Sequence, residues 1–229
     1  MQTVCREFRP FPGVRIELTT KSIDAVLAGI TNSYGIIRGA TACLAFVGDM
    51  DDPHVQEKVG YTGEGIILEA TANGLNTCWI SGSFDRKAAS YLTGITKNEK
   101  VLTVSPIGHS SQEPSLTERS MMSLFKPHKR KPLSALAGGL EESQRPSWMK
   151  AALEAARLAP SAVNRQPWRF DLDHNSITVS VDTPKLNLSS DKRLDCGIAM
   201  LHIEVAALAS SVKGKCELLE SPQVARFTV

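Results

Sequence analysis

The pattern of apolar and polar positions in the first half of the chain predicts strands at 40–47 (ATACLAFV) and 101–107 (VLTVSPI). Both runs are rich in residues that favour strands, and Gly and polar residues flank them. Between them, residues Glu64–Asn73 are apolar over most of a helical circumference, and Gly74 follows as a natural residue to end a helix. A helix that is apolar on nearly all sides is normally buried.

Two further helices are indicated by their ends. One begins after Asp85, whose side chain is a good N-cap, and it stops near Gly94. The other is capped by Ser147 and ends at Pro160. Its apolar residues recur at helical spacing and therefore face a core on one side: Met149, Ala152, Leu153 and Ala156.

The last part of the chain predicts a hairpin followed by a helix. Strands are expected at Trp168–Leu172 and Ser176–Val181, and the residues between them, 173–175 (DHN), are typical of a tight turn. An apolar helix is expected over Gly197–Ala209. This helix aligns with the earlier buried helix at a constant offset. Because any two buried helices share such a composition, an internal duplication and a chance similarity both stay open.

A change in composition separates two halves of the chain. From 110 to 147 the sequence is dominated by Ser, Glu, Pro, Lys and Gly, which is typical of an exposed crossover. We therefore expect an N-terminal half over 1–112, a crossover linker over 113–147 and a C-terminal half over 148–229.

The composition favours a small-molecule partner. The 229 residues are enough to bury a substantial core, and 26 Lys and Arg against 24 Asp and Glu leave a net charge of only +2. Such a charge produces no long-range field that would gather nucleic acid or an anionic membrane. The longest apolar stretch, around Gly39 to Val47, is too short to span a bilayer. We expect a soluble protein that binds neither nucleic acid nor membranes.

The cysteines indicate a reducing compartment. They are odd in number, widely spaced and free of any C-x-x-C pair, which argues against a disulfide framework and a zinc site: Cys5, Cys43, Cys78, Cys196 and Cys216. The expected location is the cytoplasm.

A cluster of short polar side chains follows the helix that ends at Pro160. In the segment 159–168 (APSAVNRQPW), Ser161, Asn164 and Gln166 can present hydroxyl and amide groups to a flat heteroaromatic ring. A simple helix stop and loop is the alternative. The segment resembles the signature of the nitroreductase family, Ala-Pro-Ser followed by Asn and then Gln-Pro-Trp. The resemblance implies that this turn, Pro160 included, lies against the isoalloxazine ring of FMN.

A second segment, 68–84 (LEATANGLNTCWISGSF), resembles the buried helix and the following Gly-Leu-Gly-Thr-Cys-Trp-Ile-Gly loop of the same family. Asn76 stands where the family commonly has Gly. The resemblance implies that backbone N–H groups of the loop approach flavin N5, where a donor favours the reduced flavin. The cofactor-binding residues implied here are Thr77, Cys78, Trp79, Ile80 and Ser81.

The order of the two segments differs from that of an ordinary nitroreductase, in which Ala-Pro-Ser comes first. Over most of 35–209 the chain is similar to a variant branch with two nitroreductase-like halves fused in one polypeptide. This resemblance implies an α+β nitroreductase-like fold, with pseudo-twofold duplicated halves around buried central helices. Because each half keeps a segment that the other lacks, we expect one composite FMN site per chain.

Arg130 and Lys131 are the cations expected to bind the FMN phosphate. Family members place Lys or Arg shortly after a strand that ends in Ile-Gly, here Ile107-Gly108. A solvated basic linker is the alternative. The family's N-terminal Arg-Arg-Ser-x-Arg segment has no match, since Arg6 and Arg9 differ in spacing. Each missing arginine is expected to weaken FMN binding about ten- to a hundredfold.

The resemblance implies a two-electron oxidoreductase that uses NADH or NADPH as donor and a quinone, nitroaromatic or similar small molecule as acceptor. No side chain is assigned as a catalytic acid or base, because the flavin carries the chemistry. The alternative is a degenerate relative that binds a flavin or another ligand without catalysis. Fusion of two halves would permit a monomer, and a dimer stays open.

Three other patterns are set aside. The glycines of 60–65 (GYTGEG) lack the order and the leading strand of a dinucleotide fingerprint. Cys78 has no evident His partner and is expected to be buried and inert. His202 and Glu204 lie on an apolar helix, where a core histidine is commoner than a metal ligand, so no metal site is predicted.

Overall fold

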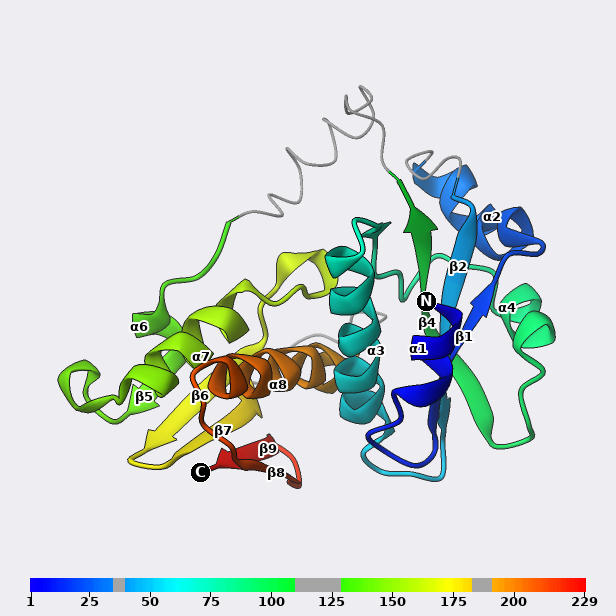
Figure 1. The fold of residues 1–229 in the computed structure, drawn as a ribbon. Helices are drawn as coiled ribbons and strands as arrows, with labels where there is room; N and C mark the ends of the chain where they lie inside the picture. The colour runs from blue at the N-terminus through cyan, green and yellow to red at the C-terminus, as the bar shows by residue number, and fades with distance from the viewer. Residues whose placement is uncertain (35–39, 110–128, 183–190) are drawn as a thin grey trace. The chain divides into compact units, whose positions relative to one another are not determined.

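The computed structural model describes residues 1–34, 40–109, 129–182 and 191–229. The chain divides into two compact units, Met1–Pro127 and His128–Val229. In the described residues, each unit has one β-sheet and its own helices (Figure 1). We call them the N-terminal unit and the C-terminal unit.

The N-terminal unit contains an antiparallel sheet in the order β1-β2-β4-β3. Its strands are β1 (Val14–Thr19), β2 (Ala42–Asp49), β3 (Asn76–Thr77) and β4 (Glu99–Gly108). The strands predicted at 40–47 and 101–107 are thus confirmed as β2 and β4, the two central strands. The short β1 was not predicted.

Both faces of β2 are covered by helices, which explains its continuous apolar run. Cys43 and Ala45 join a core cluster with Val26 of α2 and Ala89 of α4. Phe46, on the opposite side of the strand, packs against the middle of α3 beside Gly63. Strand residues alternate between the two faces, so every position of a strand covered on both sides must be apolar.

The described residues of this unit form the helices α1 (Gln2–Glu7), α2 (Ile23–Tyr34), α3 (Val55–Ala72) and α4 (Arg86–Thr93). The prediction for α4 is confirmed at both ends. The Asp85 carboxylate accepts hydrogen bonds from the backbone N–H groups of Lys87 and Ala88, and Gly94 ends the helix at φ 56°. This positive φ is a conformation that glycine adopts without strain.

Helix α3 begins at Val55 rather than at Glu64, so its predicted start was wrong. The first turns contain glycines and the charged residues Glu57 and Lys58, which break the apolar pattern on which the prediction rested. The Glu57 side chain is nevertheless fully buried, with the His54 Nδ1 atom 2.8 Å from its carboxylate. This contact joins residues only three positions apart, so a local polar pairing, which an apolar pattern does not detect, helps to bury the charged first turn of the helix.

The C-terminal unit contains a sheet in the order β5-β6-β7-β9-β8, in which only the β5–β6 pair is parallel. Its strands are β5 (Ala137–Gly139), β6 (Trp168–Asp173), β7 (Ser176–Val181), β8 (Lys215–Leu218) and β9 (Gln223–Thr228). The predicted hairpin is confirmed as β6–β7. The other three strands were not predicted.

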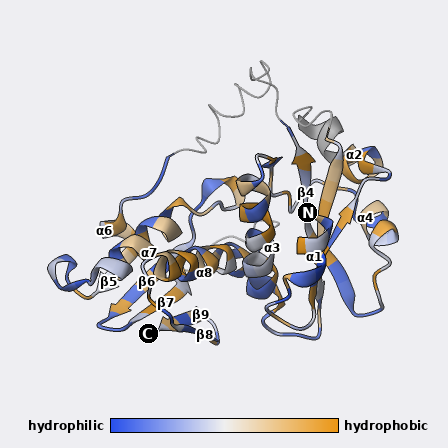
Figure 2. Cartoon of the chain, in the orientation of Figure 1, coloured by the Kyte–Doolittle hydropathy of each residue, from blue (hydrophilic) through white to orange (hydrophobic). Residues whose placement is uncertain are grey.

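This sheet is apolar on one face and polar on the other. Phe170 pairs with Val179 on the buried face, whereas Asp171 pairs with Thr178 beside Arg226 on a hollowed polar face. Figure 2 shows the resulting alternation of hydropathy along the strands. The helices pack on the apolar face. Together these contacts explain why the strands here alternate in sequence and β2 does not.

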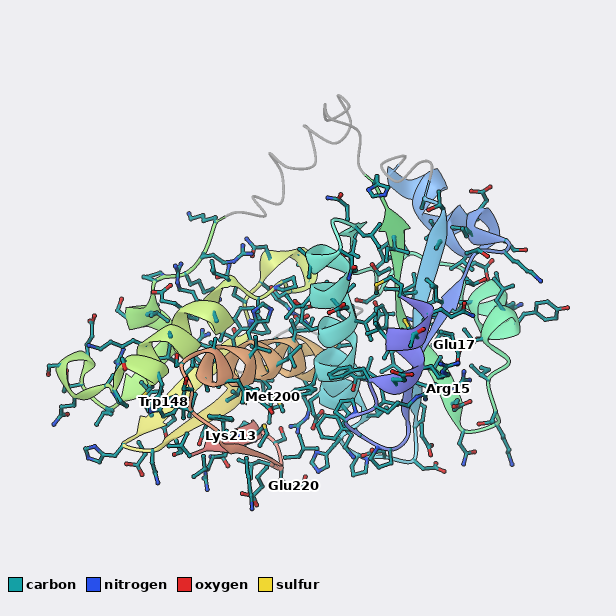
Figure 3. All side chains as sticks on the ribbon, viewed as in Figure 1. Arg15, Glu17, Trp148, Met200, Lys213 and Glu220 are labelled. Carbon is teal, nitrogen blue, oxygen red and sulfur yellow. The ribbon has the colours of Figure 1, made fainter. Side chains whose placement is uncertain are left out.

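The helical elements of the C-terminal unit are α6 (Leu133–Leu136), α7 (Ser147–Leu158), α8 (Lys192–Ala209), and the 3-10 turns η1 (Glu142–Gln144) and η2 (Ala162–Asn164). Helices α7 and α8 pack against each other, and α8 lies along β6, β7 and β9. Trp148 of α7 packs near the Phe227 ring, with 5.9 Å between ring centroids. Figure 3 labels Trp148 on α7 and Met200 on α8.

Two predicted helix starts in this unit were wrong. Pro146 occupies the N-cap position of α7, so Ser147 is the first helical residue and not the cap. Helix α8 begins at Lys192 rather than Gly197, and Asp191 caps it by accepting a hydrogen bond from the Arg193 N–H. Charged residues in the first turn of α8 hid its start from the apolar pattern.

The expected linker 113–147 lies partly outside the described residues. From 133 to 144 it carries α6, β5 and η1, all of which belong to the C-terminal unit. The internal duplication of the two halves stays a prediction. Among the residues that the structure describes, none of the helices combines the length and apolar character required to cross a bilayer.

Candidate functional site

The turn after α7 has an unusual backbone. Val163, Asn164 and Gln166 have φ values of 47°, 55° and 48°, in the left-handed region that residues other than glycine rarely occupy. Asn adopts this region with little strain, whereas the β-branched Val163 is strained there. The Val163 residue is also 57% exposed, so packing does not compensate for the strain. Each such residue costs about 1–3 kcal/mol and persists only where the surroundings hold it. We call residues 161–166 the strained turn.

The side chain of Gln166 ties the strained turn to residues 129–131. Its Oε1 atom accepts a hydrogen bond of 2.7 Å from the Lys131 N–H, and its Nε2 donates to the carbonyl oxygen of Lys129 at 3.1 Å. Nε2 also lies 3.1 Å from Asn164 Oδ1, and the Ser161 hydroxyl oxygen accepts from the Gln166 backbone N–H at 2.9 Å. Gln166 is only 4% exposed, so its side-chain amide is a buried link that holds residues 129–131 to the turn.

Arg130 also contacts the strained turn. One of its terminal nitrogens donates to Asn164 Oδ1 at 3.3 Å, and the other donates to the carbonyl oxygen of Leu158 at 3.1 Å. Asn164 Nδ2 donates to the Lys129 carbonyl oxygen at 2.8 Å. The sequence suggested Arg130 and the turn separately, and the structure brings them together within the C-terminal unit.

The Lys131 ammonium lies on the carbonyl groups of the same turn. Its Nζ donates to the backbone oxygens of Arg165 at 2.8 Å and of Gln166 at 3.1 Å. Burial lowers the pKa of Lys131, and the neighbouring positive charge of Arg169 lowers it further. The negative charge of Asp182 opposes this shift. A partly buried ammonium held by carbonyl oxygens can still receive an anion.

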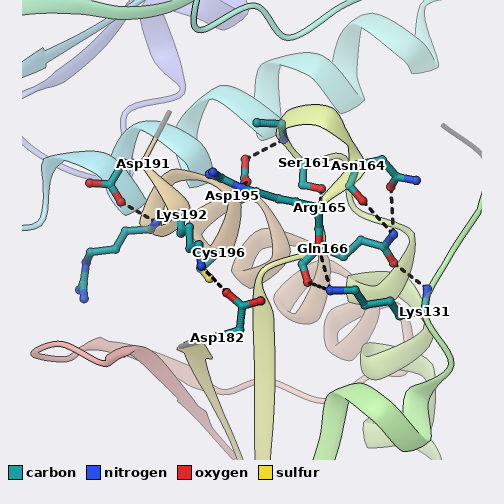
Figure 4. A network of polar contacts seen from close by, with 12 residues as sticks. Lys131, Ser161, Asn164, Arg165, Gln166, Asp182, Asp191, Lys192, Asp195 and Cys196 are labelled. Atoms are coloured by element: carbon teal, nitrogen blue, oxygen red, sulfur yellow. Dashed lines mark hydrogen bonds and ion pairs between the residues drawn. The ribbon is translucent and has the colours of Figure 1, made fainter. Parts of the chain in front are cut away.

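Asp195 of α8 holds the opposite end of the strained turn, as Figure 4 shows. Its Oδ1 accepts a hydrogen bond of 3.2 Å from the Ala162 N–H, and its Oδ2 accepts one of 2.8 Å from Arg165 Nε. Asp195 is 3% exposed. Burial raises the pKa of Asp195 to about 6, and Arg165 partly offsets the effect. Sequence reasoning missed this residue, although an acid inside the apolar run LDCGIAM was a visible signal.

The second predicted segment, 77–81, belongs to the N-terminal unit. Thr77 pairs with Ile107 in the sheet. The Trp79 ring stacks on Phe46, with centroids 4.5 Å apart and planes at 23°, and its indole N–H donates to Glu64 Oε2 at 2.9 Å. Glu64 is 2% exposed and was not predicted to matter. Trp79 is therefore anchored inside its own unit.

The rest of this segment is divided between core and surface. Ile80 is buried and forms an isolated bridge with Val104. The Cys78 N–H donates to Ser105 Oγ at 3.0 Å, and the Ser81 carbonyl oxygen accepts from Arg86. The expectation that Cys78 is buried was wrong, because its residue is exposed at the surface.

The N-terminal arginines, and the pair His202 and Glu204, show no sign of a binding site in the described residues. Arg6 pairs with Glu7 at 3.5 Å with both side chains largely exposed, and Arg9 Nε donates to the Arg6 carbonyl oxygen at 3.2 Å. His202 and Glu204 are half-buried on α8. Within the described part of the chain, His, Cys, Asp and Glu side chains do not gather into a group able to hold a metal ion.

The fold and the sequence together define a nitroreductase-like α+β protein. A family model described as "Putative TM nitroreductase" matches residues 2–207. The chain belongs to this nitroreductase family. Its members are expected to be oxidoreductases, and the resemblance drawn from the two sequence segments is confirmed at the level of the family. A search of curated proteins found no match.

Solved structures share the fold at low sequence identity. A crystal structure of a "putative nitroreductase" from Thermotoga maritima is 18% identical, with a TM-score of 0.62, over 94% of this chain and 75% of that chain. Two partial likenesses have lower scores. An FMN-dependent nitroreductase from Clostridium difficile is 15% identical over 49% of this chain and 74% of that one, with a TM-score of 0.37. A nitroreductase with bound FMN from Bacteroides fragilis is 12% identical over 50% and 76%, with a TM-score of 0.38.

Proposed function

We propose that the protein is an FMN-dependent oxidoreductase that passes two electrons from NADH or NADPH to a small electron-poor acceptor such as a quinone or a nitroaromatic. Membership of the nitroreductase family supports the class of reaction. The observation that carries the proposal is the strained turn itself. Three of its residues have a left-handed backbone conformation that costs free energy, and two cations, Arg130 and Lys131, bind to it. Strain of this kind is typical of a binding site.

The donor set of the strained turn fits FMN. The isoalloxazine ring is neutral and edged by hydrogen-bonding atoms, and the half-buried Ser161 hydroxyl and Asn164 amide lie on one short turn. Arg130 and Lys131 add positive charge at the same place, which suits a phosphate dianion. Asp195 is turned to the buried side, where Arg165 balances its charge. The turn is thus neutral to positive, as a flavin mononucleotide requires.

The residues of this turn bind and orient, and they do not carry the reaction. Ser161 offers a hydroxyl that already accepts from the Gln166 N–H and can donate its own proton to a ring atom. Gln166 and Pro160 fix the course of the backbone, and Arg130 with Lys131 would hold the phosphate. When bound, FMN supplies the hydride and electron-transfer chemistry.

The segment 77–81 is proposed as the second contribution to flavin binding. Its side chains are largely committed within the N-terminal unit, since Trp79 is bonded to Glu64 and Ile80 is part of the core. The N–H groups of Cys78 and Ile80 are already donated, to Ser105 Oγ and to the Val104 carbonyl oxygen. The segment can therefore offer its other backbone groups and the side chains of Thr77, Cys78 and Ser81. We propose no catalytic acid or base in either unit.

The proposal is tested by titrating the flavin-free protein with FMN and by following flavin reduction by NADH and NADPH. Ser161→Ala removes the hydroxyl. Asn164→Gly removes the amide while allowing the left-handed φ of 55°. Each is expected to weaken FMN binding up to about tenfold, because a neutral hydrogen bond contributes about 0.5–1.5 kcal/mol.

Leu153→Ala is the matched control, because Leu153 is fully buried on α7, the helix that leads into the strained turn. It should lower the melting temperature first, by a loss of about 2–5 kcal/mol of stability. The proposal fails if the wild-type protein binds no flavin. If FMN binds but neither nicotinamide nucleotide reduces it, the protein is a non-catalytic flavin-binding relative instead.

A further inference from the structure

We infer that Asp195 is a positioning residue that holds the strained turn in its ligand-binding conformation from the buried side. The inference deepens the proposed function and rests on it, since the ligand in question is the flavin. In this role Asp195 would make no contact with the flavin. It acts through the backbone of Ala162 and the side chain of Arg165.

The two carboxylate oxygens reach both sides of the left-handed pair Val163–Asn164. Oδ1 receives the Ala162 N–H just before this pair, and Oδ2 receives Arg165 Nε just after it. A single rigid group that bonds to both sides restricts the two residues between them. Removing it would allow φ to return to the region that L-residues prefer.

Asp195 is itself rigidly placed. It lies in the first part of α8, a helix that packs on α7 and on three strands of the sheet, and its neighbours Leu194 and Cys196 are buried. The strained turn follows α7 directly. The carboxylate therefore fixes the turn to the same helix pair that forms the core of the C-terminal unit.

A role in stability alone would not explain this arrangement. A buried ion pair is often neutral for stability or costs free energy relative to apolar packing, because both charges lose water. Here one oxygen is bonded to a backbone N–H rather than to a second cation. This use of the carboxylate specifies a backbone conformation, which is what a binding turn requires.

The arrangement implies a pH dependence of binding. The charged groups that face Asp195 are Arg165 on the turn, which favours its ionised form, and Asp191 at the start of α8, which opposes it. The adjacent Cys196 thiol is fully buried, and burial raises its pKa well above its ordinary value, so it stays neutral. Protonation near pH 6 removes the charge that receives Arg165, so flavin affinity should fall as the pH drops through about 6.

Asp195→Asn tests the inference, because Asn keeps the shape and one acceptor oxygen but places an amide N–H₂ or an uncharged oxygen against Arg165. Asp191→Asn is the matched control, since Asp191 is a carboxylate on the same helix that caps Arg193 and not the turn. Arg165→Gln is a second variant that breaks the same contact from the turn side.

Three measurements apply: amide hydrogen exchange of 161–166 without ligand, binding of riboflavin and FMN, and the pH profile of that binding. Riboflavin is included because the phosphate of FMN titrates near pH 6.

Asp195→Asn and Arg165→Gln are expected to speed exchange at the strained turn and to weaken both flavins about ten- to a hundredfold. Their riboflavin affinity should no longer change around pH 6, whereas that of the wild type should. In Asp191→Asn the change should persist but move to lower pH, because Asp191 no longer opposes ionisation of Asp195. Unchanged exchange, affinity and pH profile in both variants would overturn the inference. If the wild type binds no flavin at all, the proposed function fails, while faster exchange at 161–166 in the two variants would still support Asp195 as the residue that holds the turn.

Discussion

Gly63 of α3 lies directly beneath the Trp79 ring, so that a Cβ atom at position 63 would come within 2.4 Å of Trp79 Cη2. The same ring stacks on Phe46, and its N–H is bonded to Glu64, the residue that follows Gly63. The helix thus supplies both the space for the ring and the acceptor for its N–H. The glycine is required here by close approach, because no larger residue leaves room for the ring.

Gly63→Ala is therefore expected to destabilise the N-terminal unit by about 1–3 kcal/mol, as overpacking does, even though Ala favours helices. Gly108→Ala is the control, because a Cβ there would meet its nearest atom, Thr41 Oγ1, at an ordinary 3.7 Å. Urea unfolding of the two variants provides the comparison. Equal stability of both would show that the Trp79 ring can move aside without cost.

Replacement of Arg130 and Lys131 by Met should separate the phosphate role from the support of the turn. Methionine keeps an unbranched apolar stem, and the Lys131 backbone N–H can still donate to Gln166. If the two cations bind the phosphate, FMN affinity should fall about tenfold or more beyond the loss for riboflavin, which has no phosphate. Calorimetric titration with both ligands measures this difference. An equal loss for the two ligands would assign the cations to the turn alone.

The pair Arg15–Glu99 predicts a loss of stability in acid. Arg15 donates to both Glu99 oxygens, at 2.8 and 3.0 Å, and also pairs with Glu17, its labelled neighbour in Figure 3. The hydrogen bonds from Arg15 lower the pKa of Glu99 from 4.5 to about 2. A carboxyl whose folded pKa is depressed stabilises fully above its unfolded pKa, and this contribution is lost as the pH falls through the folded pKa.

The wild type should thus exceed Glu99→Gln in stability by about 1–3 kcal/mol at neutral pH, after allowance for solvent screening. The difference should shrink as the pH drops from about 4.5 to about 2. Urea unfolding of both proteins across this range tests it. A difference that stays constant with pH would exclude ionisation of Glu99 as its source.

One FMN per chain is the expected stoichiometry, because each half of the sequence keeps a flavin-binding segment that the other lacks. Titration of the flavin-free protein by calorimetry gives the number directly. Light scattering on the same sample gives the mass of the assembly, so that sites are counted per chain. A value near two would refute the composite arrangement.

The sequence predicted best where one local rule acted alone. Asp85 and Gly94 mark the ends of α4 through their own backbone chemistry, and the alternation of 168–181 marks a sheet with one polar face. The starts of α3 and α8 were missed because both contain buried charged residues, which break an apolar pattern. In α8, Asp195 is bonded to Arg165, 30 positions away in the sequence. No local pattern reports a partner that is distant in sequence.

The candidate site was predictable in its residues but not in its construction. Ser161, Asn164 and Gln166 were identified from a family signature, and Arg130 and Lys131 from a basic run. Their mutual contacts, the left-handed backbone and the role of Asp195 required coordinates, because these bonds join residues 35 and 33 positions apart in the chain. The flavin contacts of all these residues stay predictions.

The left-handed Val163 has a consequence for laboratory evolution of this protein. Its branched, exposed side chain contributes little packing, yet its backbone is held in a conformation that the unfolded chain avoids. A library selected only for heat resistance should therefore accumulate Gly or Asn at this position, because relief of a strained φ is an easy route to a higher melting temperature. Such clones would gain thermal stability while the strained turn lost its fixed conformation. A selection scheme must therefore screen for ligand binding and for thermal stability together.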